Sequence, residues 1–140
     1  MQKGLVYITR KVRFNAAHKL WNPSWDEAKN FEVFGKCANP NFHGHNFDLF
    51  VTLKGIPSDE TGFVYNLSDL KILLEEEILV HLDHKNLNLD VPFMQGKLSS
   101  IENLIVEIWN ILAAKLPEKT KLHKLKLYET ENNYVEYFGE

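Results

Sequence analysis

Two histidines separated by one residue, His43 and His45, follow the only cysteine of the chain, Cys37. Side chains two residues apart in an extended strand point to the same face of a sheet, so both imidazoles can aim at one point. Imidazole nitrogens are common ligands of zinc and other first-row metal ions. Gly44 between them leaves space for a ligand or another backbone segment to approach. The stretch indicates two ligands of a metal site, and a third ligand must come from elsewhere.

His18 is the candidate for that third ligand. It ends an alternating segment over residues 4–18 whose apolar side chains share its parity: Val6, Ile8, Val12, Phe14 and Ala16. Such alternation predicts a half-buried strand, and a histidine at the end of an apolar face is, taken alone, more often a core residue. A second alternating segment, from His43 to about Lys54, carries His43 and His45 on its apolar face.

Antiparallel pairing of these two strands would place the start of the second beside the end of the first. We therefore predict that His18, His43 and His45 meet at one corner of one sheet face. Three histidines with an open fourth position are typical of a catalytic zinc site, although copper, nickel and iron also accept imidazole ligands.

Three further residues could transfer protons. Five residues, Ala38 to Phe42, separate Cys37 from His43, so the thiol could be a fourth metal ligand or a base beside the metal. The alternative is a buried, inert cysteine. Asp83 and His84 could form an acid/base pair in which the carboxylate orients the imidazole, or they could be ordinary polar residues of a loop.

Two carboxylates are candidates for contacts with a substrate or for structural roles. Glu129 ends an apolar strand face, where it is either solvated or an anchor. As an anchor it can accept two parallel N–H bonds from an amidine-like edge, such as that of a 2-amino-4-oxo-pyrimidine ring. Glu102 lies at capping-box spacing from Ser99, which explains it without a ligand. His81 and His123 are expected to be structural or surface residues.

The remaining segments complete an α+β domain. Residues 19–42 form a long connection, in which Trp21 and Trp25 are expected to pin the loop. One helix is predicted from a cap at Asn66 or Ser68 to about His81, and a second from Ser99 to just before Pro117. A third strand ends near Glu129, and residues 134–138 return as a fourth. The order ββααββ predicts a four-stranded antiparallel sheet with two helices on one face.

Composition limits the function further. The 140 residues are expected to form a single domain, 1–140, and a net charge of -3 gives no electrostatic case for nucleic acid or an anionic membrane. A lone cysteine permits no intrachain disulfide and suits a reducing compartment. No signal-peptide core or membrane-spanning run is evident, so we expect a soluble, cytoplasmic protein.

Five segments in chain order resemble the 6-pyruvoyltetrahydropterin synthase family: Phe14–Leu20, Phe34–Asn46, Leu82–Leu87, Glu102–Asn103 and Tyr128–Asn133. The resemblance covers nearly the whole chain. It implies the tunnelling fold, in which three sheets close into a twelve-stranded barrel. Two such trimers would stack as a homohexamer with active sites at subunit interfaces.

The resemblance also implies the site. Zinc would lie on the three histidines, with Cys37 as the proton-abstracting base and Asp83 with His84 as its partner pair. Glu129 would hold the pterin ring of the substrate, 7,8-dihydroneopterin triphosphate, and Glu102 would lie near the same ring.

The implied reaction yields 6-pyruvoyltetrahydropterin with elimination of triphosphate. A related branch, 6-carboxytetrahydropterin synthase, uses the same substrate and zinc but releases acetaldehyde as well. Its cysteine usually sits three residues before His-Gly-His, so the five intervening residues here favour the pyruvoyl branch. A non-catalytic pterin- or metal-binding module is the third hypothesis. Phe42, where the animal enzymes have glycine, and Ile101, in place of a threonine, are departures expected to alter side-chain preference.

Overall fold

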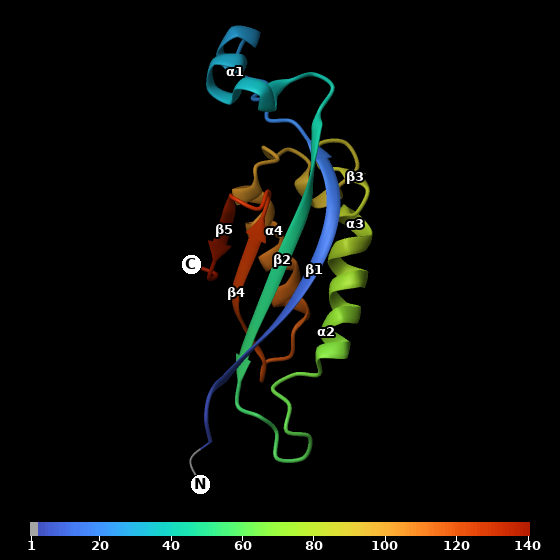
Figure 1. The fold of residues 1–140 in the computed structure, drawn as a ribbon, viewed down its shortest axis with the longest axis vertical. Coiled ribbons are helices and arrows are strands. Elements are labelled where there is room, and N and C mark those ends of the chain that lie inside the picture. The colour runs from blue at the N-terminus through green and yellow to red at the C-terminus, as the bar shows by residue number, and fades with distance from the viewer. Residues whose placement is uncertain (1–2) are drawn as a thin grey trace.

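A computed structural model describes residues 3–140 of the chain. Two long strands, β1 (Val6–His18) and β2 (His43–Gly55), form its centre (Figure 1). They pair antiparallel over their whole length, with His18 opposite His43 and Ala16 opposite His45. The expected pairing is therefore present. It brings the end of β1 and the start of β2 together at one end of the sheet.

The sheet has five strands, in the order β3-β1-β2-β4-β5. β4 (Lys121–Tyr128) pairs antiparallel with β2, and β5 (Tyr134–Tyr137) returns along β4. The prediction of four antiparallel strands is wrong in one respect. A two-residue strand, β3 (Lys85–Asn86), pairs parallel with the end of β1 at Ala16 and Ala17.

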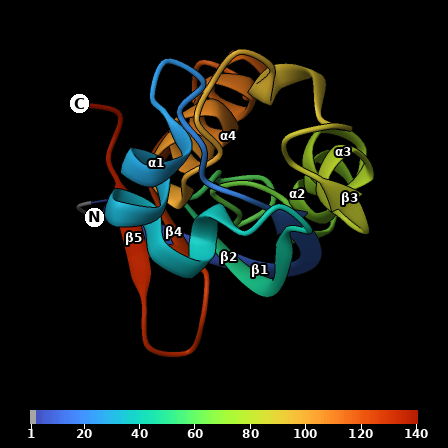
Figure 2. The ribbon, with the colours of Figure 1, turned by 90° about the horizontal axis from the view of Figure 1, so that it is seen from above.

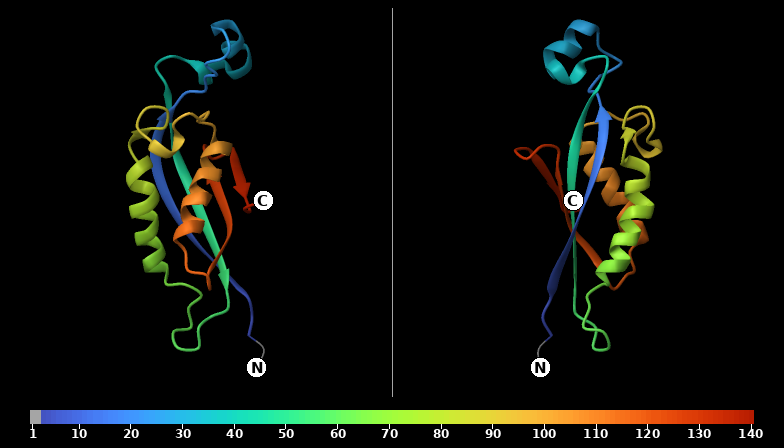
Figure 3. Two further views of the ribbon diagram at one scale, coloured as in Figure 1. Left: turned by 180° about the vertical axis from the view of Figure 1, so that it is seen from behind. Right: turned by 45° about the vertical axis from the view of Figure 1, so that its right-hand side comes forward.

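The long helices cover one face of this sheet (Figures 2 and 3). The first runs through α2 (Leu67–Leu74), a π-helical turn at Glu75–Leu79 and α3 (Val80–Leu82). The second is α4 (Ile101–Lys115). Their apolar faces pack against the apolar face of β1 and β2 and form a single core. Its members include Phe14, Phe47, Leu74, Ile78 and Ile108. Within residues 3–140, no helix covers the opposite face of the sheet.

The connection at residues 19–42 is more ordered than the expected loop. It contains α1 (Glu27–Phe34) and a 3₁₀ turn at Gly35–Ala38, both beyond the end of the sheet that holds the histidines (Figure 1). Asp26 caps α1 by accepting a bond from Lys29 N, and buried Asn30 ties the helix to Asn22. The expected role of Trp25 in pinning this segment fits its stacking on Phe34, at 5.7 Å between ring centroids.

The start of α4 differs from the predicted capping box. Ser100, not Ser99, is the N-cap, and its Oγ accepts a bond from Asn103 N at 3.2 Å. Glu102 therefore lies one position too early for a capping box and is exposed. At the other helix the choice between Asn66 and Ser68 is resolved, because Asn66 accepts from Ser68 N at 2.8 Å. A further 3₁₀ turn, Pro92–Met94, precedes α4.

Candidate active site

The paired ends of β1 and β2 bring His18, His43 and His45 together. The potential ligand atoms of these three side chains lie within 4.8 Å of one another. Their ring centroids are 4.6 Å (His18–His43), 5.2 Å (His18–His45) and 4.9 Å (His43–His45) apart. This spacing results from the strand register. His18 lies opposite His43, and His45 is two residues further along β2, so all three side chains share one sheet face. The three residues can hold a metal ion.

The nitrogens of this cluster are free to act as ligands. Within residues 3–140, His18 Nε2, His43 Nδ1 and His45 Nε2 are buried and have no hydrogen-bond partner. Buried polar atoms are normally hydrogen-bonded, and an unpaired atom in a native structure calls for a bound ion or another partner. The donor set therefore fits a metal ion that prefers nitrogen ligands.

The orientation of His18 is set by the opposite ring nitrogen. His18 is 2% exposed, and its Nδ1 lies 2.7 Å from the carbonyl oxygen of Ser99. A carbonyl only accepts, so Nδ1 carries the proton and the Nε2 lone pair faces the cluster. Ser99 is held in turn, since its hydroxyl donates to Lys19 O and to Asn88 Oδ1, each at 3.0 Å. No sequence pattern predicted that Ser99 and Asn88 would support His18 in this way.

Burial makes the three imidazoles poor bases. Desolvation is the largest cause and lowers the pKa of His18, His43 and His45 below the ordinary value of 6.5. The charge of Glu129 opposes this shift at all three histidines. Lowered pKa values keep the rings neutral near neutral pH, which is the form that binds metal.

Glu129 lies directly after β4 and faces the histidines. Its two carboxylate oxygens are each 3.9 Å from a ring nitrogen, Oε2 from His18 Nε2 and Oε1 from His45 Nε2. These distances are too long for hydrogen bonds, so the carboxylate remains available to another donor. A hollow of about 530 Å³ opens here, lined by His45, Glu129, Arg13 of β1 and neighbouring residues of β2 and the β4–β5 turn. Its size is that of a small-molecule site.

Asp83 and His84 do form a pair. Asp83 Oδ1 lies 3.1 Å from His84 Nδ1 and also accepts a 2.9 Å bond from Asn15 N, while His84 N donates to Asn15 O. The Asn15 N–H, followed by the His84 side chain, holds the pKa of the Asp83 carboxyl below its ordinary value. His84 has a φ of 61° and an 82% exposed side chain. The pair lies at the outer edge of β1, outside the three-histidine group.

Cys37 and Glu102 also lie outside that group of ligand atoms. Cys37 is a half-buried, free thiol in the 3₁₀ turn after α1. Its carbonyl accepts a 2.7 Å bond from Leu20 N, which ties this turn to the chain two residues past His18. Cys37 is thus tied to the segment that directly follows His18, but it is not among the potential metal ligands. Glu102 is exposed in the first turn of α4.

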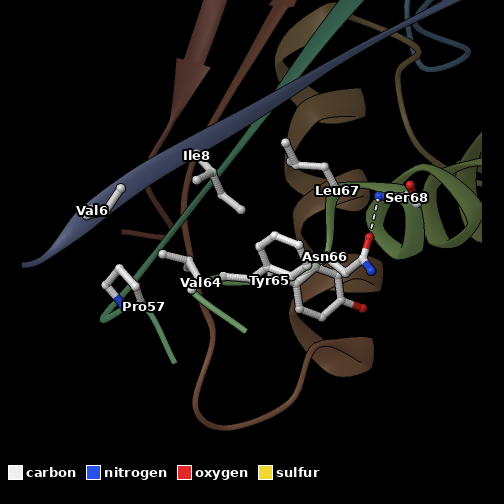
Figure 4. A pocket seen from close by; sticks show the side chains of 10 residues that line it. Val6, Ile8, Pro57, Val64, Tyr65, Asn66, Leu67 and Ser68 are labelled. Carbon is white, nitrogen blue, oxygen red and sulfur yellow. Dashed lines mark hydrogen bonds between the residues drawn. The ribbon is translucent and has the colours of Figure 1, made fainter. Parts of the chain in front are cut away.

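A second hollow lies at the far end of β1 (Figure 4). It is lined mainly by apolar side chains, including Val6, Ile8, Val64 and Tyr65, and contains none of the predicted site residues.

Among residues 3–140, none of the helices has the length and hydrophobicity that a membrane span requires.

Comparison with known proteins agrees with this geometry. The family model described as 6-pyruvoyl tetrahydropterin synthase matches residues 7–140. The chain belongs to this family. It is 47% identical over 133 residues to 6-pyruvoyl tetrahydrobiopterin synthase of Pongo abelii, which covers 95% of this chain and 91% of the relative.

Two further comparisons bear on fold and branch. The structure of Caenorhabditis elegans 6-pyruvoyl tetrahydropterin synthase superposes with a TM-score of 0.91 at 35% identity, covering 100% of both chains. Its likeness supports the tunnelling fold. A 6-carboxy-5,6,7,8-tetrahydropterin synthase of Rickettsia typhi is 25% identical over 149 residues, covering 94% of this chain and 99% of the relative. The similarity is thus much greater on the pyruvoyl side.

Proposed function

We propose that the protein converts 7,8-dihydroneopterin triphosphate to 6-pyruvoyltetrahydropterin with elimination of triphosphate, and that its metal is zinc. The observation that carries the proposal is the convergence of three unpaired, buried ring nitrogens beside the Glu129 carboxylate. His18, His43 and His45 would hold the ion and leave a fourth position for the substrate. Bound Zn²⁺ would act as a Lewis acid toward the side-chain hydroxyls and make the adjacent C–H protons removable.

Glu129 would orient the pterin. Its carboxylate has both oxygens within 4 Å of the histidines but no hydrogen bond to them, so it can accept two N–H bonds from the amino-pyrimidine edge. Glu102 would lie near the same ring. Binding the ring at a fixed distance from the three histidines would place the reacting side chain over the open position.

Proton transfer would involve the remaining residues. Cys37 Sγ would take a proton from the substrate side chain, and Asp83 with His84 would return protons to the substrate. The reaction needs no external oxidant, because the ring gains the hydrogens that the side chain loses. Triphosphate leaves with the electron pair of its C–O bond as the side chain becomes a diketone.

Assembly would bring these groups together. In one chain, Asp83 and His84 are held on the outer edge of β1, apart from the ligand cluster. We propose a homohexamer of two stacked trimers, each closing a twelve-stranded barrel, with active sites at the interfaces. The long unpaired outer edge of β1 and the outer edge of β5 support this arrangement. We also propose that residues 1–140 act as one domain in the cytoplasm, where a lone free cysteine such as Cys37 stays reduced.

Product analysis tests the reaction directly. The purified, zinc-loaded protein is incubated with dihydroneopterin triphosphate, and the products are separated and identified. Triphosphate together with a diketo pterin is the expected result. Acetaldehyde with a carboxypterin would instead assign the protein to 6-carboxytetrahydropterin synthase, the second candidate.

The Cys37→Ala variant separates catalysis from binding alone. Loss of a positioned proton-transfer group typically slows a reaction about 10²- to 10⁴-fold, so turnover should fall by at least about 100-fold. Zinc content should stay at the wild-type level, because Cys37 is outside the ligand group. Wild-type turnover in this variant would show that Cys37 is not the base, and absence of turnover in the wild type would favour the non-catalytic module.

A further inference from the structure

A groove with a positive lining lies beside the three histidines. It is lined by Lys19, the residue after His18, and its volume is about 450 Å³. The lining includes Lys97 and the amides of Asn22 and Asn88, and no carboxylate. A groove of this chemistry suits an anion.

Backbone hydrogen bonds fix Lys19 in the wall of the groove. Its N–H donates to Asn88 Oδ1 at 2.9 Å, and its carbonyl accepts from Asn88 Nδ2 and from Ser99 Oγ, each at 3.0 Å. The same Ser99 accepts from His18 through its carbonyl. The position of Lys19 is therefore coupled to that of a metal-ligand candidate.

Two aromatic rings hold the side chain of Lys19. Its Nζ is 5.4 Å from the centroid of Trp21 and 5.2 Å from that of Phe42. Phe42 directly precedes His43 and has a φ of 66°, an uncommon backbone conformation for a bulky residue. An aromatic face attracts a cation without neutralising it, so the positive charge remains available to a ligand.

Lys19 differs from neighbouring cations in having no acidic partner. Within residues 3–140, no carboxylate lies within 4.0 Å of its Nζ. Arg13 is paired with Asp48 at 2.7 Å, and Lys97 with Glu107 at 2.8 Å. Of these three cations, Lys19 alone needs no ion pair to break before it binds an anion.

We propose that Lys19 binds the triphosphate group of the substrate in this groove. The proposal rests on the proposed function, which places the substrate side chain at the three histidines. The triphosphate is attached to that side chain and would extend past His18 toward the next residue. A charged hydrogen bond from the Lys19 ammonium would hold it and stabilise the negative charge of the leaving group.

The test compares two unreactive ligands that differ only in phosphate. Dissociation constants of oxidised neopterin triphosphate and of neopterin are measured for the zinc-loaded full-length protein by fluorescence titration. In Lys19→Met, the constant for neopterin triphosphate should rise about tenfold or more, while that for neopterin stays unchanged. Lys19→Gln, a second neutral variant, should behave the same way, and Lys19→Arg should retain most of the affinity.

Lys29→Met is the matched control. Lys29 Nζ makes the same kind of contact, 4.4 Å from the centroid of Trp25, but lies in α1 and lines no part of the groove. Both affinities should remain at wild-type values. The proposal is overturned if the Lys19 variants leave the triphosphate affinity unchanged, or if they weaken both ligands equally, since that would indicate a structural role.

The binding measurement does not depend on turnover. Wild-type protein that binds both ligands and forms no product would overturn the proposed reaction alone. Wild-type protein that binds neither ligand would overturn both proposals. A steeper loss of affinity with added NaCl in wild type than in Lys19→Met is expected as well, because the lost contact is ionic.

Discussion

Each histidine of the cluster has a buried ring nitrogen that makes no hydrogen bond within residues 3–140, and burial lowers the pKa of each ring. At His18 burial lowers the pKa, and the hydrogen bond from Nδ1 to the Ser99 carbonyl opposes that shift while leaving Nε2 without a partner. His43 and His45 are less buried, and desolvation is still the largest cause of their lowered pKa. A metal ion on these lone pairs would offset the cost of burying three unpaired bases.

This arrangement makes the stability of the metal-free protein depend on pH. The pKa values of His18, His43 and His45 lie below 6.5 in the folded state. Between the folded and unfolded values the unfolded chain binds more protons, so the free energy of unfolding rises with pH. The contribution is complete above about pH 6.5 and is lost as the pH falls from there through the lowered pKa values of the folded state. Urea unfolding of the metal-free protein across this range measures the slope.

Two variants make that measurement specific. His18→Gln removes one of the three groups and should give a shallower slope. His81→Gln changes an exposed histidine outside the cluster and should leave the slope as in wild type. An equal slope in wild type and His18→Gln would show that burial of the cluster does not cause the pH dependence.

At the scale of elements, two adjacent serines at the start of α4 have different roles: Ser99 makes tertiary hydrogen bonds, and Ser100 caps the helix. Ser99 is engaged by Lys19 and Asn88, which leaves Ser100 to cap the helix. Ser100→Ala should lower the free energy of unfolding by about 1 kcal/mol, the usual cost of losing an N-cap. Glu102→Gln should change it by less than about 0.5 kcal/mol, because no capping box is present. Thermal and urea unfolding check both values, and a larger effect at Glu102 would contradict this assignment.

The same elements show which parts of the fold could be predicted. β1 and β2 are long enough for alternation to give their faces and ends, so the meeting of the three histidines followed from local periodicity. α1 has no apolar stripe, and its only buried residue is Asn30, so residues 19–42 looked like a loop. β3 has two residues, too few for any periodicity.

The candidate site could be predicted only in part for a related reason. The sequence pattern predicted Ser99 as the N-cap, whereas the structure has Ser100. The Ser99 hydroxyl binds Asn88 instead, and Asn88 lies too far away in sequence to belong to a capping motif. Asn15 binds Asp83 and His84 through its backbone atoms, which no side-chain pattern reveals. Tertiary contacts of this kind are not encoded in local periodicity.

At the scale of the whole molecule, the outer edge of β1 is the feature that matters for assembly. The carbonyls of Asn15 and Ala17 face outward, where they accept from His84 N and Leu87 N. Alternation along the strand places the backbone N–H of Lys11 on the same edge, where β3 does not reach. This part of the edge is open to pair with a strand of another chain.

Lys11→Pro should therefore break the proposed hexamer into smaller species. Proline removes the outward N–H without removing a bond between β1 and β2. Lys11→Ala removes the same side chain but keeps the N–H, and should remain hexameric. Sedimentation velocity measures the mass of each species, and a hexameric Lys11→Pro protein would show that this edge makes no contact between chains.

One consequence of the β1–β2 pairing concerns how the chain finds its native state. His18 can share a metal ion with His43 and His45 only when it lies opposite His43. A shift of one residue in the pairing of β1 with β2 would turn every β1 side chain to the other face. The same shift would displace Asn15 and so release Asp83 and His84. A metal ion that binds all three histidines therefore stabilises only molecules in which β1 and β2 pair in the native register. Refolding with zinc should leave fewer molecules in a shifted register than refolding with a chelator.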